Sequence, residues 1–100
     1  MDKSFLALVE ARWNETCRSA GGTRISTVAS RPSADELILG VTTSEARAQI
    51  KAREALRTLE ISVARFKDEK ILSEGPCGSD SEMDRKLRSL LIDLTASPFA

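Results

Sequence analysis

The chain has 100 residues, enough for one domain with a modest core, and we expect a single domain over residues 1–100. Hydrophobic residues make up 41% and charged residues 30%, which is typical of a globular and not a disordered chain. The formal charge is zero, so composition gives no sign of a nucleic-acid-binding protein. No apolar run could span a bilayer, and the N-terminus lacks a signal peptide's apolar core. We therefore expect a cytoplasmic protein.

The chain has two cysteines, and whether cysteines are paired or free indicates the redox compartment of a protein. Without a secretion signal, Cys17 and Cys77 are predicted to be free thiols. Cys17 falls on the apolar side of a predicted helix, and we expect it to pack as a small hydrophobic residue. Cys77 lies in a segment with Gly and Pro, and we expect it to be the more exposed of the two.

The first predicted element is a helix over residues 4–20. Gly21 and Gly22 end it, because Gly adopts the left-handed C-cap conformation without a Cβ clash. Trp13, the only Trp, is predicted to anchor the core. At helical spacing, one face carries Phe5, Leu6, Val9, Trp13, Thr16, Cys17 and Ala20.

A β-hairpin is predicted for residues 23–43, with a loop over residues 31–36. The first part is rich in β-branched residues, and Leu37, Leu39 and Val41 would face the core. The alternative is a short helix beginning at Ser33, which with Glu36 fits a capping box. A lone hairpin is marginally stable in water, so it must pack on the helices or extend across a dimer.

Residues 44–73 contain no Gly or Pro and are dominated by strong helix formers, which predicts one long central helix. Three large aliphatic residues, Ile50, Ile61 and Leu72, fall on the side opposite its apolar stripe. Either a second segment of the same chain or another molecule would cover them, and we favour another molecule. The stripe itself consists of Ala48, Ala52, Ala55, Leu56, Leu59, Val63 and Phe66.

The last predicted helix covers residues 81–95 and is introduced by a capping box of Ser79 and Glu82. Its position after the short segment 74–80 would return it antiparallel to the long helix, and Ile92 lies off its stripe. The predicted fold is thus α+β and mostly α: N-terminal helix, β-hairpin, long central helix and C-terminal antiparallel helix. An all-α four-helix arrangement is the alternative. The apolar stripe of this last helix, over residues 81–95, consists of Met83, Leu87, Leu90, Leu91 and Leu94.

The inventory of reactive groups argues against an enzyme. The chain has no His, so the commonest general acid–base group is missing, and no Cys–His or Ser–His pair can form. No phosphate-binding glycine motif occurs, and two cysteines sixty residues apart do not make a zinc site. We expect no catalytic residues, no cofactor and no metal.

These observations favour a small regulatory or adaptor protein that acts by protein–protein binding. It would be a homodimer, and an example is an anti-activator or inhibitor that sequesters a larger protein such as a transcription regulator. The off-stripe aliphatic residues are the predicted contacts: Ile50, Ile61, Leu72, Leu8 and Ile92. A less favoured alternative is a nucleic-acid-binding regulator that uses Arg24, Arg31, Arg47, Lys51, Arg53 and Arg57.

Overall fold

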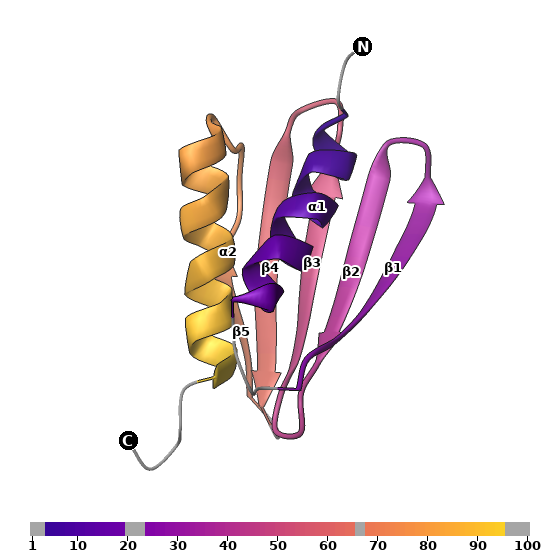
Figure 1. Cartoon of the computed structure of the whole chain (residues 1–100). Coiled ribbons are helices and arrows are strands. Elements are labelled where there is room, and N and C mark those ends of the chain that lie inside the picture. Colours follow the sequence, from indigo (N-terminus) through magenta and orange to yellow (C-terminus); the bar gives the residue numbers. More distant parts are fainter. Residues whose placement is uncertain (1–3, 20–23, 66–67, 96–100) are drawn as a thin grey trace.

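The computed structural model describes residues 4–19, 24–65 and 68–95, and these form a sheet with two helices on it (Figure 1). The two helices are the first and last elements of the chain, and the five strands lie between them in sequence. In chain order the elements are α1 (Phe5–Arg18), β1 (Ser26–Ser33), β2 (Glu36–Thr42), β3 (Arg47–Arg53), β4 (Thr58–Arg65), β5 (Asp68–Ser73) and α2 (Asp80–Thr95).

The sheet is an antiparallel meander in which each strand pairs with its neighbours in sequence, in the order β1-β2-β3-β4-β5. Both helices lie on one face of it, α1 over β2 and β3 and α2 beside β4 (Figure 1). The core lies between this face and the helices. The opposite face carries no helix among the described residues, so the molecule has two layers.

The long helix predicted for residues 44–73 is wrong, and the protein is neither mostly helical nor a four-helix arrangement. This segment forms β3, β4 and β5. Ile50 and Ile61 pair directly across β3 and β4, and both belong to the buried core. In a strand, alternate residues share a face, and the buried positions of these two strands are Ala48, Ile50, Ala52, Leu59, Ile61 and Val63.

The helix prediction failed partly because the turn between β3 and β4 contains neither Gly nor Pro. Arg57 adopts a positive φ of 46° there, a conformation that usually goes to Gly or Asn. The Arg57 N–H donates to the carbonyl of Glu54 at 3.3 Å and closes the turn. Tertiary contacts thus override the helix propensity of the residues between the strands.

The hairpin predicted for residues 23–43 is present as β1 and β2, which excludes the alternative helix beginning at Ser33. Leu37, Leu39 and Val41 are buried, as the alternation predicts. The loop is shorter than the predicted six residues, because β1 continues to Ser33 and only residues 34–35 join the strands. An irregularity between Ser30 and Ser33 accommodates the extra residue in β1.

Both terminal helices form close to their predicted bounds, and Trp13 is fully buried, as predicted. Its indole Nε1–H donates to Thr27 Oγ1 at 3.0 Å, which ties α1 to β1. The five stripe residues of α2 are all buried. Cys77 is 2% exposed, so its predicted exposure is wrong, while Cys17 is half-buried; both are free thiols. Phe66 and Ala20, which were predicted to be in the core, lie outside the described residues.

The N-terminus of α1 meets the tips of two hairpins at one end of the sheet. The Glu54 carboxylate accepts from the N–H groups of Phe5 at 2.8 Å and Leu6 at 3.4 Å. Ser4 receives the next two N–H groups, through its side chain and its carbonyl. The three open N–H groups of the first turn, from Phe5 to Ala7, therefore have partners, and the bond from Leu8 to the Ser4 carbonyl begins the regular helical series. Asp35 in turn accepts from the backbone N–H of Glu54 at 2.9 Å, which joins the two hairpin tips.

Candidate interaction surfaces

The five residues predicted to form an interface do not share one surface. Ile50 and Ile61 are 0% and 1% exposed, so the expectation that they lie away from the core is wrong. Leu8 and Leu72 are partly buried and pack against the core. Ile92 alone is well exposed, at 62%, on the outer side of α2. The structure thus leaves Ile92 accessible and gives the other four a role in packing.

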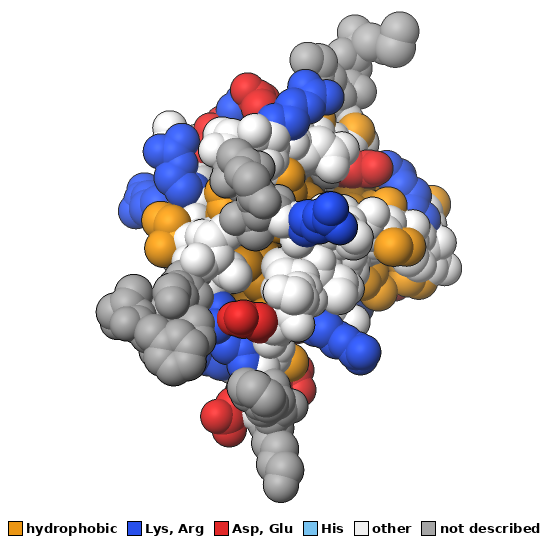
Figure 2. Space-filling model, turned by 60° about the horizontal axis from the view of Figure 1, so that its bottom comes forward, with side chains coloured by type: hydrophobic (Ala, Val, Ile, Leu, Met, Phe, Trp, Pro, Cys, Tyr) orange, Lys and Arg blue, Asp and Glu red, His pale blue; other side chains and the backbone are white. Residues whose placement is uncertain are grey.

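Three large aliphatic residues that the sequence reasoning did not select are exposed: Val28 on β1, Leu56 in the β3–β4 turn and Ile71 on β5. The signal that could have found Val28 and Ile71 is the two-residue period of the strands. It was interpreted as helical for the segment that contains Ile71, and it was recognised in the hairpin of Val28 without being used to select exposed residues. Val28 lies opposite Gly40 and Ile71 opposite Ser62, so both are on the helix-free side of the sheet. In Figure 2, hydrophobic side chains also reach the surface on the side where β1 and β2 lie.

We use the term open face for the side of the sheet that carries no helix. It carries three basic and three acidic side chains, and two of the basic ones, Lys51 and Arg53, have an acidic residue on a neighbouring strand. The third, Arg47, lies opposite Thr42 and Ala64. Arg53 lies 3.8 Å from Glu36, and Lys51 lies 4.0 Å from Glu60. The open face carries Ser26, Val28, Ser30, Glu36, Ile38, Gly40, Thr42, Arg47, Gln49, Lys51, Arg53, Thr58, Glu60, Ser62, Ala64, Glu69 and Ile71.

This balance bears on the nucleic-acid alternative. Phosphate binding needs clustered positive charge, but Lys51 and Arg53 on β3 each have a carboxylate on a neighbouring strand. Arg31 is directed to Glu10, at 4.0 Å, and the Arg57 guanidinium lies 4.9 Å from the centre of the Phe5 ring. Four of the six basic residues predicted for nucleic acid, Arg31, Lys51, Arg53 and Arg57, are therefore engaged in separate local contacts, and this arrangement does not favour nucleic acid.

The largest hollow described lies on the open face where β3 turns into β4, with a volume of about 640 Å³. Ile38 and the exposed Leu56 supply its aliphatic side chains, and the two ion pairs just described stand beside them. Glu74, which follows β5, adds one more carboxylate. An aliphatic centre with a charged rim is the composition of a protein–protein contact rather than that of a small-molecule pocket.

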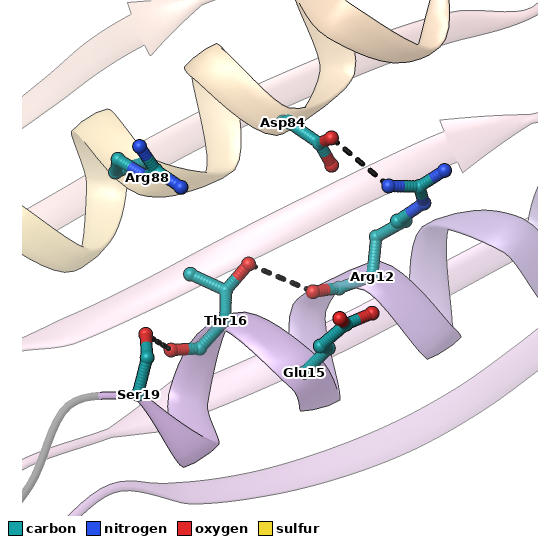
Figure 3. A pocket seen from close by; sticks show the side chains of 6 residues that line it. All are labelled: Arg12, Glu15, Thr16, Ser19, Asp84 and Arg88. Atoms are coloured by element: carbon teal, nitrogen blue, oxygen red, sulfur yellow. Dashed lines mark hydrogen bonds and ion pairs between the residues drawn. The ribbon is translucent and has the colours of Figure 1, made fainter.

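A second, smaller groove of about 180 Å³ runs between the helices (Figure 3). Arg12 reaches across it from α1, donating to Asp84 at 2.9 Å and lying 3.6 Å from Asp80. On the α1 side, the Thr16 hydroxyl donates to the Arg12 carbonyl at 2.8 Å. The groove is largely occupied by contacts that join α1 to α2, and we interpret it as a structural link.

A third hollow, of about 460 Å³, lies on the outer side of α2. Ile92 is its aliphatic member, and Arg85 and Arg88 stand along the same side of the helix. This surface retains one predicted contact residue, but it has a single exposed aliphatic group, and single exposed apolar residues are ordinary on any surface.

The described residues hold no group of three or more potential metal ligands and no buried charged or polar side chain. Burial raises the pKa of both the Cys77 and the Cys17 thiol, which keeps them in the protonated, weakly nucleophilic form. No helix in this part of the chain has the length and apolar character needed to cross a membrane.

Comparison of the chain with protein-family models, with curated proteins and with solved structures gave no match.

Proposed function

We propose that the protein is a small non-enzymatic regulator or adaptor that binds another protein through its open face. The observation that carries this proposal is the hollow at the β3–β4 turn, where Leu56 is 70% exposed beside Ile38. A helix-free sheet face is held rigid by its strand pairing and can receive a partner without rearrangement. The free thiols suit a reducing compartment such as the cytoplasm.

The rim of the hollow indicates what kind of partner segment would fit. Lys51 and Arg53 are half-exposed or more, and their ion pairs with Glu60 and Glu36 are long, so they can exchange these contacts for a partner's carboxylates. We therefore propose a segment with an aliphatic side chain at its centre and charges of both signs around it. A larger regulatory protein that is sequestered in this way is the favoured class of partner.

The experiment is a pull-down from nuclease-treated lysate of the source cells, with the wild-type chain and three variants as bait. Leu56→Ser removes the exposed aliphatic group and Lys51→Glu reverses a rim charge, both without disturbing the core. We expect the wild type to retain a protein that both variants lose by at least roughly tenfold, the loss of about 1.4 kcal/mol of binding.

Ile92→Ser is the matched control, because Ile92 is similarly exposed but lies on α2. Retention of the same protein by this control supports the open face. If Ile92→Ser loses the protein and Leu56→Ser keeps it, the binding surface is the outer side of α2 and the open-face proposal is wrong.

A further inference from the structure

The two outer strands of the sheet differ in how well they are protected against pairing with another strand. Outer strands carry backbone N–H and C=O groups on one side that no neighbour receives, and proteins protect them with charges, bulges and short length. β5 has six residues, of which Asp68, Glu69 and Lys70 are charged, and its pairing with β4 shifts register between Ile61 and Ser62. β5 therefore carries all three forms of protection.

β1 lacks this protection over its first five residues, Ser26–Ser30. None of them is charged, none is Gly or Pro, and each pairs in regular register with a residue of β2. The charge of Arg31, the ring of Pro32 and the register shift all come after Ser30. Figure 1 shows β1 at the rim of the sheet with no helix in front of it. The segment Ser26–Ser30 is thus an open pairing edge.

The side chains of this segment complement themselves. Antiparallel strands related by a two-fold axis form a continuous sheet when the axis stands perpendicular to it, which keeps the helices of both copies on one side. Residues that face each other then point to the same side of the sheet. An axis through Val28, the centre of the segment, places Val28 against Val28, Thr27 against Ala29 and Ser26 against Ser30.

Each of these pairs is favourable or neutral. The two Val28 side chains, each 70% exposed in one copy, would cover one another on the open face. Ser26 and Ser30 can share a hydrogen bond beside them. On the helix side, Thr27 and Ala29 are both small, so the contact between Thr27 and Trp13 is preserved. No pair brings like charges together.

We infer that β1 is the surface on which two copies of this chain pair, antiparallel about Val28, to form one sheet from the strands of both. The occupant is a second copy because the self-pairing matches at every position, which a foreign strand would achieve only by chance. This inference is independent of the proposed function, since the hollow at Leu56 lies at the β3–β4 turn and stays accessible in such a pair. The strip of the open face around Val28 would then run from one copy into the other.

Sedimentation velocity from low micromolar to submillimolar concentration tests the inference. We expect the wild type to approach twice the chain mass as concentration rises, because a five-residue strand pair is a small interface. Val28→Lys should stay a monomer, with an unchanged circular dichroism spectrum. Ile71→Lys, the matched change on the other outer strand, should dimerise like the wild type.

A wild type that remains a monomer over the whole range would overturn the inference, as would dimers that persist in Val28→Lys and disappear in Ile71→Lys. Should Val28→Lys lose its fold, Ser30→Lys places the same charge two residues along the same edge and replaces it.

Cysteine cross-linking tests the register. In an antiparallel pair, the Cα atoms of opposed residues lie about 4.5–5.5 Å apart, within reach of a disulfide. Val28→Cys should therefore form a covalent dimer on oxidation. Ser26→Cys should not, because the two Ser26 positions would be separated by four residues, roughly 13 Å. The unmodified chain controls for Cys17 and Cys77. Equal cross-linking of Ser26→Cys and Val28→Cys would refute the axis through Val28.

Discussion

Glu54 connects two parts of the chain that the sequence places far apart. Its carboxylate caps the first turn of α1, and its backbone N–H donates to Asp35 in the tip of the neighbouring hairpin. A negative charge at a helix N-terminus is favourable because the open N–H groups carry partial positive charge. The same residue thus stabilises a helix through its side chain and holds the β3–β4 turn, in which Leu56 is exposed, through its backbone.

Replacing Glu54 with Ala should therefore lower the free energy of unfolding by about 1–2 kcal/mol, the range for a lost N-cap with hydrogen bonds to a charged group. The measurement is urea denaturation followed by circular dichroism. Glu60→Ala is the control, because its ion pair with Lys51 is 4.0 Å long and partly exposed, and we expect a change below about 0.5 kcal/mol. Equal losses in the two variants would contradict the capping role.

At the scale of elements, the sequence predicted α1, the β1–β2 hairpin and α2 because each carries its own start or stop signals. Ser4 and Ser79 cap the helices, and β-branched residues and the Leu37–Leu39–Val41 alternation mark the hairpin. The segment from β3 to β5 could not be read in the same way. The turn between β3 and β4 has no Gly or Pro. Two of the six buried positions on these strands are Ala, and several of the residues that alternate with the buried ones are charged residues that also suit a helix.

Two residues in this segment were inconsistent with a helix. Ile50 and Ile61 were the misfits of the helical interpretation, and as strand residues they are the centre of the buried face. Their misplacement also misplaced the candidate site, because a residue assigned to the wrong side of an element is assigned to the wrong surface. Leu56 was assigned to the core stripe of the helix for the same reason, and this was wrong, because it is 70% exposed.

The start of α2 makes stability depend on pH. Its Glu82 carboxylate accepts from the Gly78 N–H at 3.0 Å, and this bond, together with Lys86, lowers the pKa of Glu82. A lowered pKa means that the ionised form is favoured in the folded state. The stabilisation is therefore present above the unfolded value of about 4.3 and is lost as the pH falls through the folded pKa.

Glu82→Gln should accordingly melt below the wild type at neutral pH, and the gap should close as the pH falls below about 4. Melting temperatures measured across this range provide the test. Glu69→Gln, on the exposed β5, controls for the change in net charge. A gap that stays constant down to the most acidic pH would show that Glu82 acts without its charge.

At the scale of the whole molecule, stability depends on two helices covering a single face of the sheet. Trp13 is the largest side chain in that layer, is fully buried and is hydrogen-bonded to Thr27. Domains of this size have only about 5–15 kcal/mol of net stability. A large cavity under α1, such as truncation of Trp13 would create, therefore removes a substantial part of this net stability.

Trp13→Ala should lower the free energy of unfolding by about 3–5 kcal/mol, leaving a protein that is close to unfolding at 25 °C. Chemical denaturation gives the value, and Ile92→Ala, at an exposed position on the other helix, should change it by less than about 0.5 kcal/mol. A loss at Trp13 no larger than that of the control would mean that α1 does not stabilise the sheet.

The cap that Glu54 places on α1 also sets the order of events during synthesis. The N–H of Phe5 can be capped only after synthesis of Glu54, whose carboxylate lies 49 residues further along the chain. In contrast, each strand of the meander can pair with the strand synthesised just before it. At roughly 5–20 residues per second, the ribosome needs about 2–10 seconds to supply that group. Over this interval α1 lacks the Glu54 carboxylate, and β2 and β3, the strands that cover the helix, are complete only at its end. The apolar side of α1, with Trp13 in it, is therefore the part of the chain that stays uncovered longest before the sheet can receive it.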